Sequence, residues 1–156
     1  MIIRALSEIE DKTVKYIICG QGELNEYLER LIAEKNLQGR VKLLGYRSDI
    51  RELLHMADVF AFPSKREGLG LAALEAMAAG LPLITSYVGG IKDFVEDGKS
   101  GYCIYLKNVD EVVSVIYKMF DNEVFLIKCG SSNYETVKKF DIKNTNKIMS
   151  QVYLQI

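Results

Sequence analysis

Residues 58–80 read DVFAFPSKREGLGLAALEAMAAG, and this stretch says more about the architecture than any other part of the chain. Its apolar opening run ends in a proline that cannot donate a ladder hydrogen bond, which predicts a strand over residues 58–63. Residues 71–79 are dense in Ala, Leu and Met and predict a helix, and Gly80 followed by Pro82 is the usual stop after a helix. A polar, glycine-bearing loop joins the strand to the helix.

The same alternation of strand and helix continues on both sides of this stretch. The predicted strands cover residues 14–19, 41–45, 58–63, 83–86 and 102–105. The predicted helices cover residues 2–10, 24–32, 50–56, 71–79 and 91–95, with two or three more from residue 109. Ser48 or Asp49, with Glu52 as its capping-box partner, is expected to cap the helix over 50–56. Because the strands are continuously apolar, we expect the α/β fold class: one Rossmann-like, three-layer domain over residues 1–156 with a mostly parallel sheet.

Composition excludes several classes of protein. The chain has 156 residues, 49% of them hydrophobic, so it can bury a core. Its 20 basic and 21 acidic side chains leave a net charge of -1, which argues against a nucleic-acid platform. No apolar stretch approaches the roughly 18 residues of a spanning helix, and the first residues lack a signal-peptide pattern. The cysteines are widely spaced and odd in number, which fits neither a disulfide framework nor a zinc site, so we expect a cytoplasmic protein.

Polar and glycine residues gather in the loops that follow the predicted strands. Ligands of parallel sheets bind beyond the carboxyl ends of the strands, so the candidate loops are residues 20–23, 45–48, 63–70 and 86–90. Gly68 and Gly70 would let the backbone approach a ligand closely. The free N–H groups at the start of the next helix would suit a phosphate.

Two carboxylates, Glu67 and Glu75, flank the start of this helix. They would repel a phosphate unless they bind something else, and sugar hydroxyls suit ionised carboxylates, which only accept hydrogen bonds. The alternative is that both are ordinary acids, one at a helix end and one on a solvated face. Glu75, however, stands in the apolar run of residues 71–79, where we expect its carboxylate to need a partner.

Several motifs occur in a fixed order along the chain. They are Gly20-Gln21-Gly22-Glu23, Gly45-Tyr46-Arg47, Ala57-Asp58-Val59-Phe60-Ala61-Phe62-Pro63-Ser64, Glu67-Gly68-Leu69-Gly70, Leu74-Glu75-Ala76-Met77-Ala78-Ala79-Gly80-Leu81-Pro82, Val88-Gly89-Gly90 and Asp97-Gly98-Lys99-Ser100-Gly101. In this order they resemble the C-terminal, donor-binding domain of the family 4 (group 1) glycosyltransferases, which have the two-domain GT-B architecture. The resemblance covers nearly the whole chain.

The resemblance implies a retaining transfer of a hexose from a nucleoside diphosphate sugar, such as a UDP-sugar, with no metal and no other cofactor. Glu67 would be the catalytic residue and bind hydroxyls of the transferred sugar, while Glu75 would hold the ribose. The backbone of Gly68, Leu69 and Gly70 would contact the sugar and the phosphates, in agreement with the argument from the helix start.

The resemblance also implies the remaining contacts and partners. The loop of Gly45, Tyr46 and Arg47 would lie against the nucleobase, and Gly20 and Gly22 would line the donor site. The acceptor would be a glycan, a lipid or lipid-linked molecule, or a protein, as in polysaccharide biosynthesis, and no nucleic acid would take part. The whole enzyme would be cytoplasmic, with peripheral contact at the inner face of the cell membrane as an option.

The chain departs from the family pattern at its start. In the family, an Arg and a Lys on an early loop stabilise the leaving diphosphate, and no such loop precedes Ile2. The helix predicted over residues 2–10 also lacks a cap. We therefore interpret residues 1–156 as a fragment whose N-terminal, acceptor-binding domain is missing, and we expect it to be inactive alone. Asp93 stands where the family often has Glu, and its role is left open.

A non-catalytic nucleotide-sugar-binding or regulatory module is the alternative function, because the sequence shows binding elements more clearly than chemistry. A phospho-receiver domain would need its acceptor at the carboxyl end of a strand, whereas Asp58 opens one. A sugar-nucleotide epimerase or a phosphorylase is another option, and the phosphorylase would need a cofactor lysine that the sequence does not identify. His55 has no Gly-x-Ser-x-Gly elbow with which to form a catalytic triad.

Other reactive or charged groups have plain interpretations. Cys19 and Cys103 lie in apolar strands and are interpreted as small core residues. Lys65 and Arg66 could face a phosphate or be solvated. Asp141 interrupts a lysine-rich stretch, which we interpret as a solvated helix face rather than a membrane contact. The lysines of this stretch are Lys138, Lys139, Lys143 and Lys147.

Overall fold

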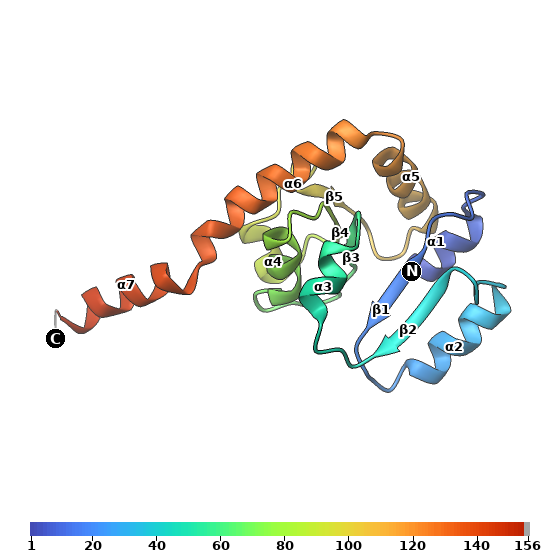
Figure 1. Ribbon diagram of the computed structural model, residues 1–156, viewed down its shortest axis with the longest axis horizontal. Helices are drawn as coiled ribbons and strands as arrows, with labels where there is room; N and C mark the ends of the chain where they lie inside the picture. The colour runs from blue at the N-terminus through green and yellow to red at the C-terminus, as the bar shows by residue number, and fades with distance from the viewer. Residues whose placement is uncertain (155–156) are drawn as a thin grey trace.

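The structure, a computed structural model, describes residues 1–154 (Figure 1). Its strands are β1 (Tyr16–Cys19), β2 (Val41–Gly45), β3 (Phe60–Phe62), β4 (Leu83–Thr85) and β5 (Gly101–Cys103). Its helices are α1 (Ile2–Glu8), α2 (Asn25–Glu34), α3 (Ile50–His55), α4 (Leu71–Ala78), α5 (Val109–Phe120), α6 (Glu123–Val137) and α7 (Ile142–Tyr153). Two 3-10 turns are η1 (Gly89–Asp93) and η2 (Lys138–Phe140). The predicted order is confirmed, except that the helix expected over residues 91–95 is the short 3-10 turn η1.

All ladders between the strands are parallel, as predicted, but the strands form two sheets. β1 pairs with β2, and β3, β4 and β5 pair in that order. Among residues 1–154 no ladder joins one sheet to the other. The α/β class with a parallel, Rossmann-like arrangement is therefore confirmed, while the expected single sheet is divided.

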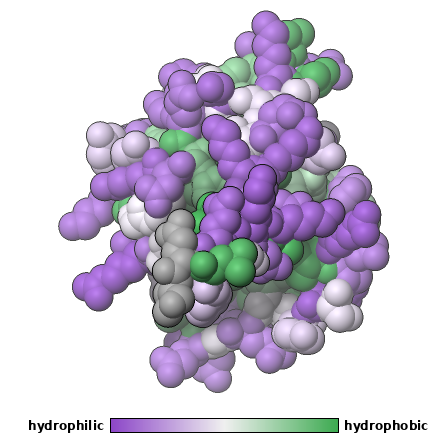
Figure 2. All heavy atoms as spheres, turned by 90° about the vertical axis from the view of Figure 1, so that its left-hand side faces the viewer, coloured by the Kyte–Doolittle hydropathy of each residue, from purple (hydrophilic) through white to green (hydrophobic). Residues whose placement is uncertain are grey.

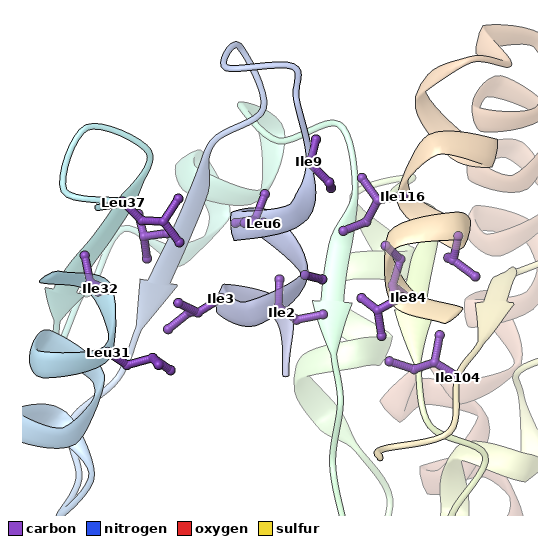
Figure 3. Close-up of a cluster of buried hydrophobic side chains, with 14 of the residues drawn as sticks. Ile2, Ile3, Leu6, Ile9, Leu31, Ile32, Leu37, Ile84, Ile104 and Ile116 are labelled. Carbon is purple, nitrogen blue, oxygen red and sulfur yellow. The ribbon is translucent and has the colours of Figure 1, made fainter. Parts of the chain in front are cut away.

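Alternate residues of the strands face two separate cores. The first core holds α1, α2 and α5 against strands of both sheets, and Figure 3 shows Ile3 of α1, Leu31 of α2 and Ile84 of β4 within it. The second core packs α3, α4 and η1 against the other face of β3, β4 and β5, where Leu83 is fully buried. Since neighbouring residues of a strand point to opposite faces, β3, β4 and β5 form the middle of three layers.

The sheet of β1 and β2 is covered on one face only. Tyr16 and Ile18 pack against the first core, whereas Ile17 is 47% exposed and belongs to neither core. Cys19 is also exposed, so the prediction that it is a core residue is wrong. Its strand is apolar, but the face to which its side chain points has no covering helix.

A buried arginine attaches α1 to the start of this two-stranded sheet. Arg40 is 7% exposed, and its Nη1 donates to the carbonyl oxygens of Leu6 and Ile9 at 2.9 and 3.0 Å. Its Nε donates to the Val14 oxygen at 3.1 Å, and its Nη2 donates to the Asp11 oxygen at 2.9 Å. The guanidinium thus satisfies carbonyl groups at the end of α1, and they in turn compensate the burial of its charge.

A buried asparagine attaches α6 to the opposite side of the domain. Asn133 has no exposed surface, and its Nδ2 donates to the carbonyl oxygens of Leu81 and Ser100, both at 2.8 Å. Its Oδ1 accepts no hydrogen bond from the described residues. One turn earlier, a Cβ on Gly130 would lie 2.2 Å from the Gly80 oxygen, so α6 passes in direct contact with the end of α4.

The last helix, α7, points away from the body of the molecule (Figure 1) and buries none of its residues. Seen from that side, the surface is largely hydrophilic, with hydrophobic side chains scattered among polar ones (Figure 2). The lysines predicted to be solvated are all exposed, namely Lys138, Lys139, Lys143 and Lys147. Among residues 1–154, no helix has the length and apolar character needed to cross a membrane.

Candidate functional site

The loops after β1 and β2 meet at the carboxyl edge of their sheet, toward which both arrowheads point in Figure 1. The Gly20 N–H donates to the Gly45 carbonyl oxygen at 2.7 Å. Gly20 and Gly45 have φ values of 130° and 64°, in the region that favours glycine. Gly22 is exposed. The structure therefore brings Gly20 and Gly45 together, and their contact with a donor stays a prediction.

Tyr46 and Arg47 follow on the second of these loops, and both are exposed. The Arg47 Nε donates to Asp49 Oδ1 at 2.7 Å, and its Nη2 donates to Oδ2 of the same carboxylate. This hydrogen-bonded ion pair holds the pKa of Asp49 below its usual value. It also corrects the capping prediction: Asp49 is the N-cap residue of α3, but its carboxylate binds the guanidinium and not the backbone of Glu52.

Glu67 is half-buried, and its own loop orients it. The Ser64 Oγ donates to Glu67 Oε1 at 2.6 Å. The loop is held in turn from β4, because the Thr85 Oγ1 donates to the Phe62 oxygen at 2.9 Å and the Ser86 hydroxyl donates to the Ser64 oxygen. These hydroxyl side chains were not among the predicted site residues. The signal that could have found them is their position at the ends of two neighbouring strands.

A pair of glycines packs against the backbone that carries Glu67. The Gly90 N–H donates to the Gly68 oxygen at 2.9 Å. A Cβ on Gly89 would lie 1.9 Å from the Glu67 oxygen, and one on Gly90 would lie 2.1 Å from the Gly68 oxygen. Because only glycine permits this approach, the loops after β3 and β4 are joined into one unit. The sequence had pointed to both loops but not to their contact.

Gly70 starts α4 and leaves the first N–H groups of the helix free. It is the N-cap residue, with a φ of 80°. Its carbonyl oxygen accepts from the N–H groups of Ala73 and Leu74 at 2.9 and 3.2 Å. The N–H groups of Leu71 and Ala72 come before the first of these bonds, so they are available to an anion. Gly68 and Leu69, the other predicted backbone contacts, are exposed beside them.

Glu75 lies one turn further along α4 and lines a cleft of about 580 Å³. Arg51 and His55 of α3 and Tyr134 of α6 form other parts of its wall. The residues that α4 buries are Ala73, Leu74, Ala76 and Met77. Glu75 is exposed on the other side of the helix, so the expectation that its carboxylate needs a buried partner is wrong. The alanine-rich sequence concealed which side of α4 faces the core.

The cysteine thiols of this chain are not activated, because burial raises the pKa of each of them. His55 is exposed, with its Nδ1 2.8 Å from the Arg51 oxygen. Burial raises the pKa of the Cys103 thiol to about 11 and also raises that of Cys129. No group of three His, Cys, Asp or Glu side chains in this part of the chain is placed to hold a metal ion. Transfer without a metal or cofactor stays a prediction.

Comparison with known sequences connects this geometry to one family. The family described as "Glycosyl transferases group 1" matches residues 1–139. The UDP-Gal:alpha-D-GlcNAc-diphosphoundecaprenol alpha-1,3-galactosyltransferase of Escherichia coli is 36% identical over 135 residues, which cover 85% of this chain and 35% of that protein. The poly(ribitol-phosphate) alpha-N-acetylglucosaminyltransferase of Staphylococcus aureus is 31% identical over 129 residues, or 82% of this chain and 26% of that one.

Comparison of structures leads to the same family. The crystal structure of HepE from Anabaena in complex with UDP and glucose matches with a TM-score of 0.90 and 25% identity, over 99% of this chain and 44% of that chain. This chain thus spans less than half the length of each of these relatives. The family match, the relatives and the shared fold show that the chain belongs to the group 1 glycosyltransferases, as a Rossmann-like domain of the GT-B architecture.

Proposed function

We propose that this chain is the donor-binding domain of a retaining hexosyltransferase whose donor is a nucleoside diphosphate sugar. The observation that carries the proposal is the arrangement around Glu67. Ser64 orients its carboxylate, and Gly89 and Gly90 hold its backbone, directly before the free N–H groups of α4. Hydroxyl groups suit the carboxylate, and an anion suits the N–H groups. A sugar diphosphate offers both in one molecule.

In this proposal the diphosphate lies at the start of α4, where the N–H groups of Leu71 and Ala72 and the helix dipole stabilise negative charge. Glu67 accepts hydrogen bonds from hydroxyls of the sugar, and Glu75 accepts them from the ribose. The bond between the anomeric carbon and the diphosphate oxygen breaks, and the diphosphate leaves with the electron pair. The acceptor oxygen bonds to the same face of that carbon, and its proton passes to the oxygen of the leaving diphosphate. No metal is required.

The names of the relatives support a UDP-sugar as the donor. The E. coli relative is named for UDP-Gal, and HepE was crystallised with UDP and glucose. The same E. coli name supports a lipid-linked acceptor, and the S. aureus name supports a polymer acceptor. We assign the acceptor to a second, N-terminal domain outside these residues, because the relatives are more than twice as long. Alone, the chain binds the donor weakly and transfers little; the whole enzyme acts in the cytoplasm, beside the membrane.

Calorimetric titration with UDP, GDP, ADP and UDP-glucose tests the division of roles. Glu75→Gln should weaken the binding of UDP and UDP-glucose alike, by about 1–3 kcal/mol, because both ligands carry the ribose. Glu67→Gln should weaken only UDP-glucose. Glu29→Gln, on the exposed face of α2, is the matched control and should change neither. No nucleotide binding at millimolar concentration, or equal effects of the two site variants on both ligands, would overturn the proposal.

A further inference from the structure

The loop that carries Glu67 and the loop after β4 run side by side in the same direction. Three contacts join them, in the same order along both segments: Ser64 to Ser86, Glu67 to Gly89 and Gly68 to Gly90. They extend the parallel pairing of β3 with β4 beyond the carboxyl edge of the sheet. Lys65 of the first loop therefore lies beside Tyr87 of the second.

Tyr87 presents an aromatic ring at the surface of this double loop. Ser86, before it, is buried, and Val88, after it, packs against the second core, so the backbone on both sides of Tyr87 is fixed. The Tyr87 side chain itself is 53% exposed. The Nζ of Lys92, in η1, lies 5.4 Å from the centroid of the ring, which is a cation–π contact. The surface thus combines an aromatic ring with an ammonium group.

Three cations lie on the two loops, and we call them, together with the ring, the Tyr87 cluster: Lys65, Arg66, Tyr87 and Lys92. All three cations are exposed, and none forms an ion pair with a side chain of residues 1–154. The acids of residues 64–68 and 86–93 are Glu67, which accepts a hydrogen bond from its own loop, and Asp93. The two loops therefore carry a net positive charge in a chain whose net charge is -1, and an anion suits them.

We propose that the Tyr87 cluster binds the acceptor, and that the acceptor carries a sugar joined to a phosphate or diphosphate. The sugar ring stacks on Tyr87, because the negative face of an aromatic ring attracts the C–H groups that a pyranose presents. The cations of the cluster pair with the phosphate oxygens. This inference rests on the proposed function and deepens it: the donor-binding domain holds the charged end of the acceptor, and the N-terminal domain holds the rest.

The position of the cluster suits an acceptor better than the diphosphate of the donor. In the proposed function that diphosphate lies at the start of α4, which follows Glu67 along the loop, whereas Lys65 and Arg66 precede Glu67. Gly89 touches the backbone of Glu67, and Tyr87 comes two residues before Gly89. A ring stacked on Tyr87 would therefore lie next to the sugar that Glu67 holds, where a hydroxyl must arrive for transfer.

Nuclear magnetic resonance titration of the 156-residue chain with glucose 1-phosphate is the first part of the test. The chain is first saturated with UDP-glucose, so that the site of Glu67 is occupied and the probe must bind elsewhere. The amide signals of Lys65 and Tyr87 should shift with glucose 1-phosphate but not with glucose at the same concentration. No shift at millimolar concentration would overturn the inference. Displacement of UDP-glucose by the probe would also overturn it, because the cluster would then belong to the donor site.

Removal of charge from the cluster is the second part. Lys65→Gln combined with Lys92→Gln should weaken binding of glucose 1-phosphate at least about tenfold and leave the affinity for UDP-glucose unchanged. The matched control, Lys42→Gln combined with Lys139→Gln, removes the same charge at exposed positions elsewhere and should change neither affinity. Equal losses in the two double variants would overturn the inference, because the attraction would then come from the net charge of the chain.

The aromatic ring is tested separately. Tyr87→Ala should lower the affinity for glucose 1-phosphate about fivefold, to the level of inorganic phosphate, whereas Tyr87→Phe should keep it, because stacking needs the ring and not the hydroxyl. Ribitol 5-phosphate, which has a phosphate without a ring, should bind no better than inorganic phosphate. If it binds as well as glucose 1-phosphate and does not depend on Tyr87, the stacked sugar is wrong and a polyol phosphate is the acceptor.

The donor titration separates this inference from the proposed function. If the chain binds UDP-glucose but not glucose 1-phosphate, the proposed function stands and the inference is overturned. If the chain does not bind UDP-glucose, the proposed function is overturned, and the inference with it.

Discussion

The sheet of β3, β4 and β5 and the sheet of β1 and β2 have the same parallel pairing but different surroundings. Leu83, Ile84 and Thr85 of β4 are all buried, with helices on both faces of the strand. In β1, exposed and half-buried residues alternate, and Ile17 points to an uncovered face. One part of the molecule therefore has three layers and the other has two. The difference teaches that apolar strands alone do not decide how many layers form around them.

The loops at the carboxyl edges differ in the same way. The loop that carries Glu67 receives hydrogen bonds from Thr85, Ser86 and Gly90. The loops after β1 and β2 are joined by the bond from Gly20 to Gly45. The loop of the candidate site that neighbouring segments fix with more hydrogen bonds therefore lies on the three-layered part of the molecule.

The largest expected effect compares one strand residue from each sheet. Leu83→Ala should lower the free energy of unfolding by about 2–5 kcal/mol, because it leaves a cavity between filled layers. Ile17→Ala should lower it by less than about 1 kcal/mol, because its side chain is already half in water. Urea denaturation followed by circular dichroism measures both. Equal losses would mean that the face of Ile17 is covered in solution.

A smaller effect is expected at the side chain that holds the two-layered part together. Arg40→Met should lower the free energy of unfolding by about 2–3 kcal/mol, because the carbonyl groups at the end of α1 lose a charged donor. Lys42→Met, on the exposed side of β2, is the control and should cost little. The same urea titration applies. If Arg40→Met lowers the free energy of unfolding no more than Lys42→Met does, then water fully replaces the hydrogen bonds that the guanidinium donates.

Next in size is the effect of the hydrogen bond from Ser64 that orients Glu67. Ser64→Ala should weaken binding of UDP-glucose about fivefold, which is about 1 kcal/mol, because the carboxylate loses the hydrogen bond that orients it. Binding of UDP should not change, since UDP lacks the sugar. Calorimetry measures both, with Ser114→Ala on the exposed side of α5 as the control. An equal loss for UDP would mean that Ser64 shapes the whole loop and not the carboxylate alone.

The smallest effect concerns the ion pair beside β2. Arg47 lowers the pKa of Asp49 from 3.8, so the pair stabilises the fold above that pH and loses its contribution as the pH falls below it. Asp49→Asn should therefore lower the urea midpoint slightly at about pH 7 and less at about pH 3. A difference between the two proteins that does not change with pH would contradict this assignment.

Local signals predicted the order of the elements. Pro63 closes the run that forms β3, and Gly80 stops α4, because each residue acts on its own backbone. The loop of Glu67 could also be predicted, since it follows a strand and precedes a helix. Short-range patterns of this kind do not depend on which strands pair.

Features that depend on distant segments could not be predicted. The division into two sheets rests on the open edges of β1 and β3, which no local pattern reports. Asp49 is a local exception: it has the residue type of a helix cap, but the guanidinium of Arg47 on the same loop competes for its carboxylate and binds it more strongly. Glu75 stands among alanines, which tolerate both buried and exposed positions, so the packing of α4 alone decided its exposure.

Asn133 carries a consequence for the chemical ageing of the protein. Hydrolysis of its side-chain amide would replace the two N–H donors with a carboxylate oxygen that faces the carbonyl oxygens of Leu81 and Ser100. Two attractive contacts would become repulsive ones inside a space with no exposed surface. Deamidation at this one position would therefore weaken the attachment of α6 to the domain with almost no change in the size of the side chain.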